Sequence, residues 1–285
     1  MIEKYYDGAI EQVAAGLGTV EKNYLLVRYS GQFSVENLND TKQLEKNEDI
    51  FVQVHEFETG EITCAYEPYL TMICDGFRRY MTGTFEEFME TCDVYYLHRP
   101  VLLGYFNQDN TGREEIILLD EVAYEQERML AALERMLCAI ADRHPVLFVL
   151  NRFQLASKST MQLTARFLKC ENCNIGLVLG VSDIQAMPEF LVPDWEMLYE
   201  TLDDGSKIYH IGNSGRKKEE TIDDEKYVDY GSEKVYRKLQ NMVEFLDFDQ
   251  AAYYLETIER KIKFDNLLVD DAARFRMWLL FVKVS

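Results

Sequence analysis

The sequence has few basic residues, few histidines and no long apolar run. It holds 30 lysines and arginines against 50 aspartates and glutamates, a formal net charge of -20. A field of that sign repels nucleic acid and anionic membranes, so we expect no binding to either. No apolar run approaches the roughly 20 residues of a membrane span. Residues 1–4 lead into acidic sequence without a signal peptide, which predicts a cytoplasmic protein.

Motifs for metal binding are equally scarce. Among the six cysteines, only Cys170 and Cys173 have C-x-x-C spacing. A zinc site would need a second such pair or nearby histidines. The four histidines, which lie far apart in the sequence, are His55, His98, His144 and His210. We therefore predict no metal site and interpret the cysteines as reduced structural thiols.

What the sequence does contain is an alternation of helical patterns and short apolar runs. Its 285 residues, 47% hydrophobic, suit one large globular domain or two modest ones. Strands are predicted at residues 24–29, 50–55, 146–150 and 174–181, with a short one at 209–211. Helices are predicted at residues 2–17, 68–81, 84–92, 116–143 and 157–169, the third of them with a capping box of Thr84 and Glu87. Strands that are apolar on both faces, joined through helices, indicate an α/β fold with a three-layer parallel sheet.

The last part of the chain is predicted to be helical. Helical patterns cover residues 232–246, 249–263 and 268–284, after a charge-dense stretch at 216–231. This predicts an α/β domain over 1–215, a charged linker over 216–231 and an all-α segment over 232–285. The apolar pattern at 277–282 indicates the N-terminal part of a longer protein, with a natural end as the alternative.

The segment after the first predicted strand lacks the chemistry of a phosphate loop. Nucleotide-binding α/β proteins carry such a loop between that strand and the next helix. It needs glycines, so that backbone N–H groups can wrap the phosphates, and a lysine for the β/γ charge. Residues 24–38 hold one glycine, Gly31, and no lysine followed by serine or threonine. We infer an architecture for nucleotide binding that has lost its nucleotide.

In the order of its elements, the chain resembles a STAND-type AAA+ ATPase module followed by tetratricopeptide-like helices, over residues 5–285. Such modules form the N-terminal half of many large bacterial signalling proteins, in which helical repeats lead to an output domain. Residues 25–27 resemble the first core strand, 30–33 the phosphate loop and 146–150 the Walker B strand. The resemblance implies a sheet of the P-loop NTPase type and a C-terminal segment like tetratricopeptide repeats.

The position after the Walker B strand departs from the pattern of an active ATPase. A functional strand ends in an acidic residue that holds Mg²⁺ through water and activates the nucleophile. Here Asn151 takes that place, followed by Arg152. Asparagine can neither accept a proton nor neutralise a cation at neutral pH. With the lysine missing as well, we expect a pseudo-ATPase with no catalytic residues, because phosphoryl transfer depends on these charges.

Three hypotheses follow. The first is a non-catalytic sensor or scaffold module of a cytoplasmic bacterial signalling protein. It would act without a cofactor, through contacts with a protein partner or an attached output domain, and its oligomeric state stays open. The second is a divergent ATP- or ADP-binding switch. The third is an adaptor whose α/β part is only a platform. The residues that the second would use, around the phosphates and the metal position, are Arg28, Ser30, Gly31, Gln32, Ser34, Asn151 and Asp183.

Overall fold

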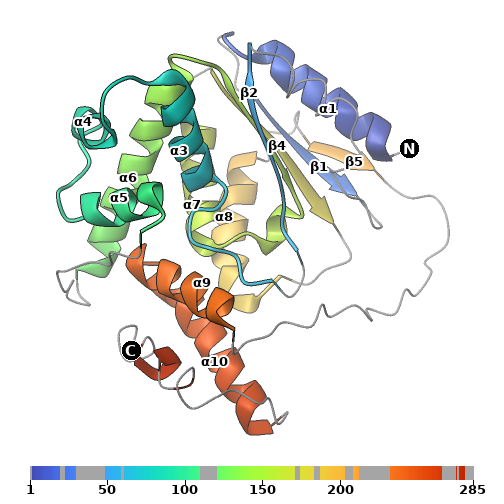
Figure 1. The fold of residues 1–285 in the computed structure, drawn as a ribbon. Helices are drawn as coiled ribbons and strands as arrows, with labels where there is room; N and C mark the ends of the chain where they lie inside the picture. The colour runs from blue at the N-terminus through green and yellow to red at the C-terminus, as the bar shows by residue number, and fades with distance from the viewer. Residues whose placement is uncertain are drawn as a thin grey trace.

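A computed structural model describes most of the chain. The described residues are 2–19, 23–29, 49–58, 61–109, 121–170, 174–182, 187–202, 208–211, 232–264, 274 and 276–279. They form an α/β body with a parallel sheet, followed by C-terminal helices (Figure 1). The predicted α/β class is therefore confirmed. The predicted linker at 216–231 lies outside the described residues, and the division into domains stays a prediction.

The sheet places the first strand in its interior. The strand order is β2-β3-β4-β1-β5, and every neighbouring pair is parallel. The strands are β1 (Tyr24–Tyr29), β2 (Phe51–Glu56), β3 (Val146–Asn151), β4 (Ile175–Ser182) and β5 (Ile208–Ile211). All five match predicted strands, and β3 extends one residue further than predicted, to include Asn151.

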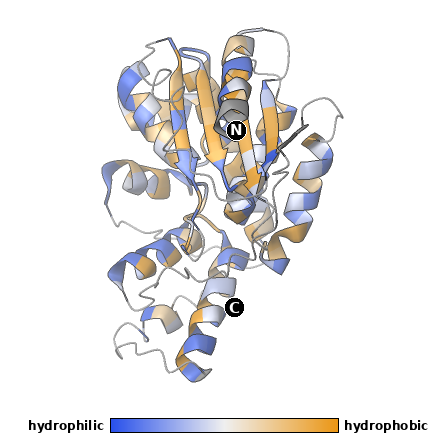
Figure 2. Cartoon of the chain, turned by 90° about the vertical axis from the view of Figure 1, so that its right-hand side faces the viewer, coloured by the Kyte–Doolittle hydropathy of each residue, from blue (hydrophilic) through white to orange (hydrophobic). Residues whose placement is uncertain are grey.

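Helices cover both faces of the sheet because its central strands are apolar on both sides. Every residue of β3 and β4 is buried. On one face, α1 (Ile2–Gly16) packs Ile10 and Val13 against Leu25 and Val27 of β1. The helices that share the core of the other face are α3 (Tyr69–Tyr80), α6 (Val122–Ala141), α7 (Lys158–Lys169) and α8 (Val192–Leu202). Figure 2 shows the apolar strands between helices that carry polar residues.

Two short helices follow α3. The predicted capping box is confirmed at the start of α4 (Phe85–Thr91), where Thr84 and Glu87 bond each other's backbone N–H groups. The pattern over residues 95–108 is ambiguous, because Pro100 and Gly104 interrupt an apolar and aromatic stretch. Helix α5 (Arg99–Asn107) lies there, with Pro100 in its first turn. Short 3₁₀ turns, η2 (Phe153–Leu155) and η3 (Glu189–Leu191), precede α7 and α8. Helix α8 falls in a region for which the sequence predicted no helix.

The C-terminal helices α9 (Glu233–Glu244) and α10 (Phe248–Phe264) form a hairpin with its own small core. Ile62, from the segment after β2, is part of that core, so the hairpin packs against the α/β body near the carboxyl ends of the strands (Figure 1). Of the third predicted helix, residues 274 and 276–279 are described, and they are helical. None of the described helices combines the length and the apolar character needed to cross a membrane.

Candidate functional site

A buried hydrogen bond joins the carboxyl ends of β1 and β3. The Tyr29 hydroxyl donates to Asn151 Oδ1 at 2.6 Å, and the two residues are 1% and 0% exposed. Strand β4 lies between them in the sheet. Gly180 of β4, the partner of Val27, carries no side chain. The residue that ends β3 therefore already has its side-chain carbonyl oxygen bound by another side chain.

The tyrosine stays a hydrogen-bond donor over the whole physiological range. Burial raises the pKa of Tyr29 to about 12, although the positive charge of Arg152 lowers it. A protonated phenol donates one hydrogen bond, and the amide oxygen of Asn151 accepts it. Neither group can supply the negative charge with which a carboxylate would hold a divalent cation.

Arg152, the residue after Asn151, links the end of β3 to the neighbouring strand β2. Arg152 has the left-handed φ of 53°, which turns the chain sharply out of β3. Its Nη2 lies 3.2 Å from Glu56 Oε1, and both side chains are largely buried. The backbone N–H of Phe57 donates to the carbonyl of Asn151 at 3.1 Å. The cation nearest to Asn151 in sequence is thus neutralised by a carboxylate from β2.

The sequence-predicted site residues divide into three groups. Asn151 lies on the face covered by α1, beside Tyr29. Arg28 points to the opposite face, as alternation along a strand requires, and its guanidinium lies 5.4 Å from the Tyr199 ring of α8. The Nε of Arg28 is buried and has no hydrogen-bond partner among the described residues. The residues outside the described part of the chain are Ser30, Gly31, Gln32, Ser34 and Asp183.

A second polar cluster, missed from the sequence, joins the hairpin to the start of α7. Asp247, in the turn between α9 and α10, is 1% exposed. Its Oδ2 accepts from the backbone N–H of Ser159 at 3.2 Å and from the Ser159 hydroxyl at 2.5 Å. Burial raises the pKa of Asp247 to about 6, against the lowering effect of the Ser159 bonds. No local signal marks Asp247, because its partner lies in a distant helix.

Helix α9 also binds the segment that follows β2. Lys238 Nζ donates to Glu61 Oε1 and to the Ile62 carbonyl, both at 2.7 Å. The backbone N–H of Ala65 donates to Asn241 Oδ1 at 3.0 Å. The hairpin therefore contacts the segments that leave the carboxyl ends of both β2 and β3, the edge at which open parallel sheets bind ligands.

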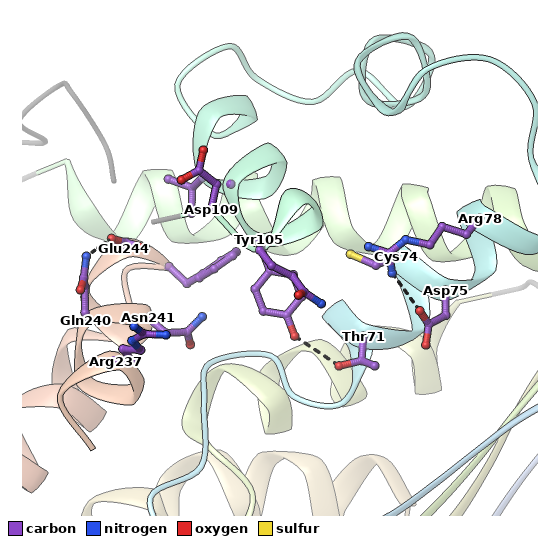
Figure 3. Close-up of a pocket in the computed structure, with 14 residues that line it drawn as sticks. Thr71, Cys74, Asp75, Arg78, Tyr105, Asp109, Arg237, Gln240, Asn241 and Glu244 are labelled. Carbon is purple, nitrogen blue, oxygen red and sulfur yellow. Dashed lines mark hydrogen bonds and ion pairs between the residues drawn. The ribbon is translucent and has the colours of Figure 1, made fainter. Parts of the chain in front are cut away.

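A cavity of about 530 Å³ lies between α3, α5 and α9 (Figure 3), within the range of small-molecule sites. Its polar side chains are mostly engaged with neighbours. Arg78 contacts Asp75 at 3.0 Å, and the Tyr105 hydroxyl lies 3.2 Å from Thr71 Oγ1. Gln240 donates to Glu244 at 2.7 Å. The cavity thus marks the junction of the body and the hairpin, and no predicted site residue lines it.

Histidine and cysteine side chains are in contact with other side chains in the described part of the chain. Within the described ranges, no group of three or more His, Cys, Asp or Glu side chains could hold a metal ion. The His55 ring packs edge-on against the Phe57 ring, with 4.5 Å between the ring centroids. Burial lowers the pKa of His55. Cys173 lies outside the described residues, whereas Cys170 contacts Cys138 of α6.

No known protein-family model matches this chain, and a search of curated proteins finds no significant match. The fold and the side-chain geometry therefore carry the functional argument.

Proposed function

We propose that this chain is a non-catalytic module of the P-loop NTPase type, a sensor or scaffold in a cytoplasmic bacterial signalling protein that works through protein–protein contacts. The observation that carries the proposal is the state of Asn151. It ends β3, where the resembling ATPases need an acid, and its side-chain oxygen is bound by Tyr29 in a fully buried contact. An uncharged, occupied side chain cannot perform the acid's role.

The parallel sheet supports the choice of fold type. Strand β4 lies between β3 and β1, with β5 on the other side of β1. The helical hairpin of α9 and α10 after this body agrees with a tetratricopeptide-like segment.

Contacts at the carboxyl edge support a role in transmission of conformational change. The hairpin binds the segment after β2 through Lys238 and the start of α7 through Asp247. A partner that moved the hairpin would therefore act directly on the sheet edge, and the reverse holds equally. Such coupling requires contacts between the two parts and no nucleotide chemistry.

The test is a thermal-shift titration of the full chain with Mg·ATP and, separately, Mg·ADP. We expect no change in Tm at millimolar nucleotide. A ligand at 100 times its Kd would stabilise the fold by about 2.7 kcal/mol, a shift of several degrees.

Two variants distinguish the proposal from the divergent switch. Arg28→Ala removes the arginine at the end of β1, and Arg78→Ala removes an arginine that lines the cavity between α3, α5 and α9. A nucleotide-induced shift in wild type and in Arg78→Ala that disappears in Arg28→Ala would refute the proposal and establish a nucleotide site beside β1.

A further inference from the structure

Two cysteines from different helices lie in contact. The sulfur of Cys138, near the end of α6, is 3.7 Å from the sulfur of Cys170, which directly follows α7. Both residues are partly exposed, as is Cys64, whereas Cys74 and Cys92 are buried. The sequence pairs Cys170 with Cys173 by spacing, but the fold brings it to a cysteine 32 positions earlier.

The register of the two helices holds this contact in place. One helical turn before the cysteines, Arg166 Nε of α7 donates to Glu134 Oε2 of α6 at 2.7 Å. This pair is also separated by 32 positions in the chain. Two successive contacts with the same offset mean that α6 and α7 run side by side in the same direction. The sulfurs therefore face each other because the helices are aligned.

We propose that Cys138 and Cys170 form a reversible disulfide when the protein meets a peroxide. A disulfide needs the sulfurs at about 2.05 Å, so the two side chains must close from the 3.7 Å seen here. The ion pair of Arg166 and Glu134, one helical turn away, holds α6 and α7 together while the disulfide forms. This inference is independent of the proposed function, since it requires neither nucleotide nor partner.

The reaction balances with hydrogen peroxide as the oxidant. The Cys170 thiolate attacks one peroxide oxygen, the O–O bond breaks, and the departing hydroxide takes up a proton as water. The Cys138 sulfur then attacks the sulfenic sulfur of Cys170. The S–S bond forms, the S–O bond breaks, and the leaving hydroxide takes the Cys138 proton as a second water. Two thiols lose two electrons, and one peroxide becomes two waters.

Burial and the adjacent Cys170 sulfur raise the pKa of Cys138. Cys138 is well placed as the resolving thiol, because the sulfenic acid would form in contact with it. The new covalent loop encloses β3, with Asn151, and α7, whose first turn binds Asp247. Oxidation would thus restrain the segment between the sheet edge and the hairpin.

The experiment treats the reduced full chain with hydrogen peroxide, blocks free thiols, and maps crosslinked peptides by mass spectrometry without reduction. We expect the intact mass to lose two hydrogen atoms, with the crosslink between Cys138 and Cys170. We also expect Tm to rise by roughly 5–10 °C and dithiothreitol to reverse the rise.

Variants serve as the matched control. Cys138→Ser and Cys170→Ser should abolish the crosslink, whereas Cys74→Ser and Cys92→Ser should retain it. A crosslink between Cys170 and Cys173, or peroxide consumption that yields only sulfinic acid at Cys170, would overturn the proposal. The mapping is done on the wild-type chain, so its result stands even where a serine variant fails to fold.

Discussion

The carboxylate of Asp247 should make the protein less stable as the pH rises through the mildly acidic range. Its ordinary pKa of 3.8 is raised to about 6 in the folded chain, chiefly by burial. The folded state therefore binds more protons than the unfolded state between these values, and the free energy of unfolding falls as the pH increases. The shift in pKa from 3.8 to about 6 corresponds to a total decrease of about 3 kcal/mol in the free energy of unfolding, at 1.36 kcal/mol per pKa unit.

The variant Asp247→Asn isolates this contribution. An amide oxygen can still accept from Ser159, but it does not titrate. Between pH 5 and pH 7, wild type should lose about 1.4 kcal/mol of stability relative to the variant. This window stays above the isoelectric point near 4.6, where solubility is lowest. Urea unfolding of both proteins at several pH values measures the difference directly.

The control is Asp75→Asn, which removes an exposed carboxylate that pairs with Arg78 at 3.0 Å and is not among the charges that act on Asp247. Its stability should follow the same pH slope as wild type, since an exposed pair contributes little. Curves for wild type and Asp247→Asn that run parallel from pH 5 to pH 7 would show that Asp247 is not buried against Ser159 as described.

Three further substitutions test the packing. Tyr29→Phe removes the hydrogen bond to Asn151 and should cost about 1–2 kcal/mol in urea unfolding; an unchanged midpoint would contradict the buried contact. Gly76→Ala should cost about 1–3 kcal/mol, because the new Cβ would lie 2.8 Å from Ile140 Cγ2. Gly8→Ala, in α1, meets nothing within 4 Å and should raise Tm through a gain of about 0.5–1 kcal/mol. Equal changes in stability for Gly76→Ala and Gly8→Ala would refute the expected difference between a crowded position and an open one.

The sequence predicted the sheet well because its strands are buried on both faces. Runs such as residues 146–150 have no polar face, so the pattern alone marks them as interior strands. Helix α8 was not predicted, since only Leu198 and Leu202 are buried in it and they define no continuous apolar stripe. The ambiguity at α5 has a similar cause, with aromatic residues and Pro100 obscuring a short helix.

The candidate site could be predicted only in part. The resemblance to the ATPase module singled out Asn151, because this residue follows the strand that resembles the Walker B strand. Its partner Tyr29 could not be identified, because their contact depends on which strand lies between β1 and β3. Asp247 and the Cys138–Cys170 contact likewise depend on how distant helices pack. The spacing of residues along the chain does not predict such contacts.

The position of β1 in the sheet also sets an order of events during synthesis. Tyr24–Tyr29 pairs with β4 and β5 alone, at Ile175–Ser182 and Ile208–Ile211. A nascent chain that has emerged as far as α7 therefore holds an apolar strand with both edges open. Such edges invite pairing with other chains, and contacts between distant segments form slowly. The protein is thus most exposed to aggregation between the emergence of β1 and that of β4. During this interval α1 can cover one face of β1, against which it packs in the folded protein.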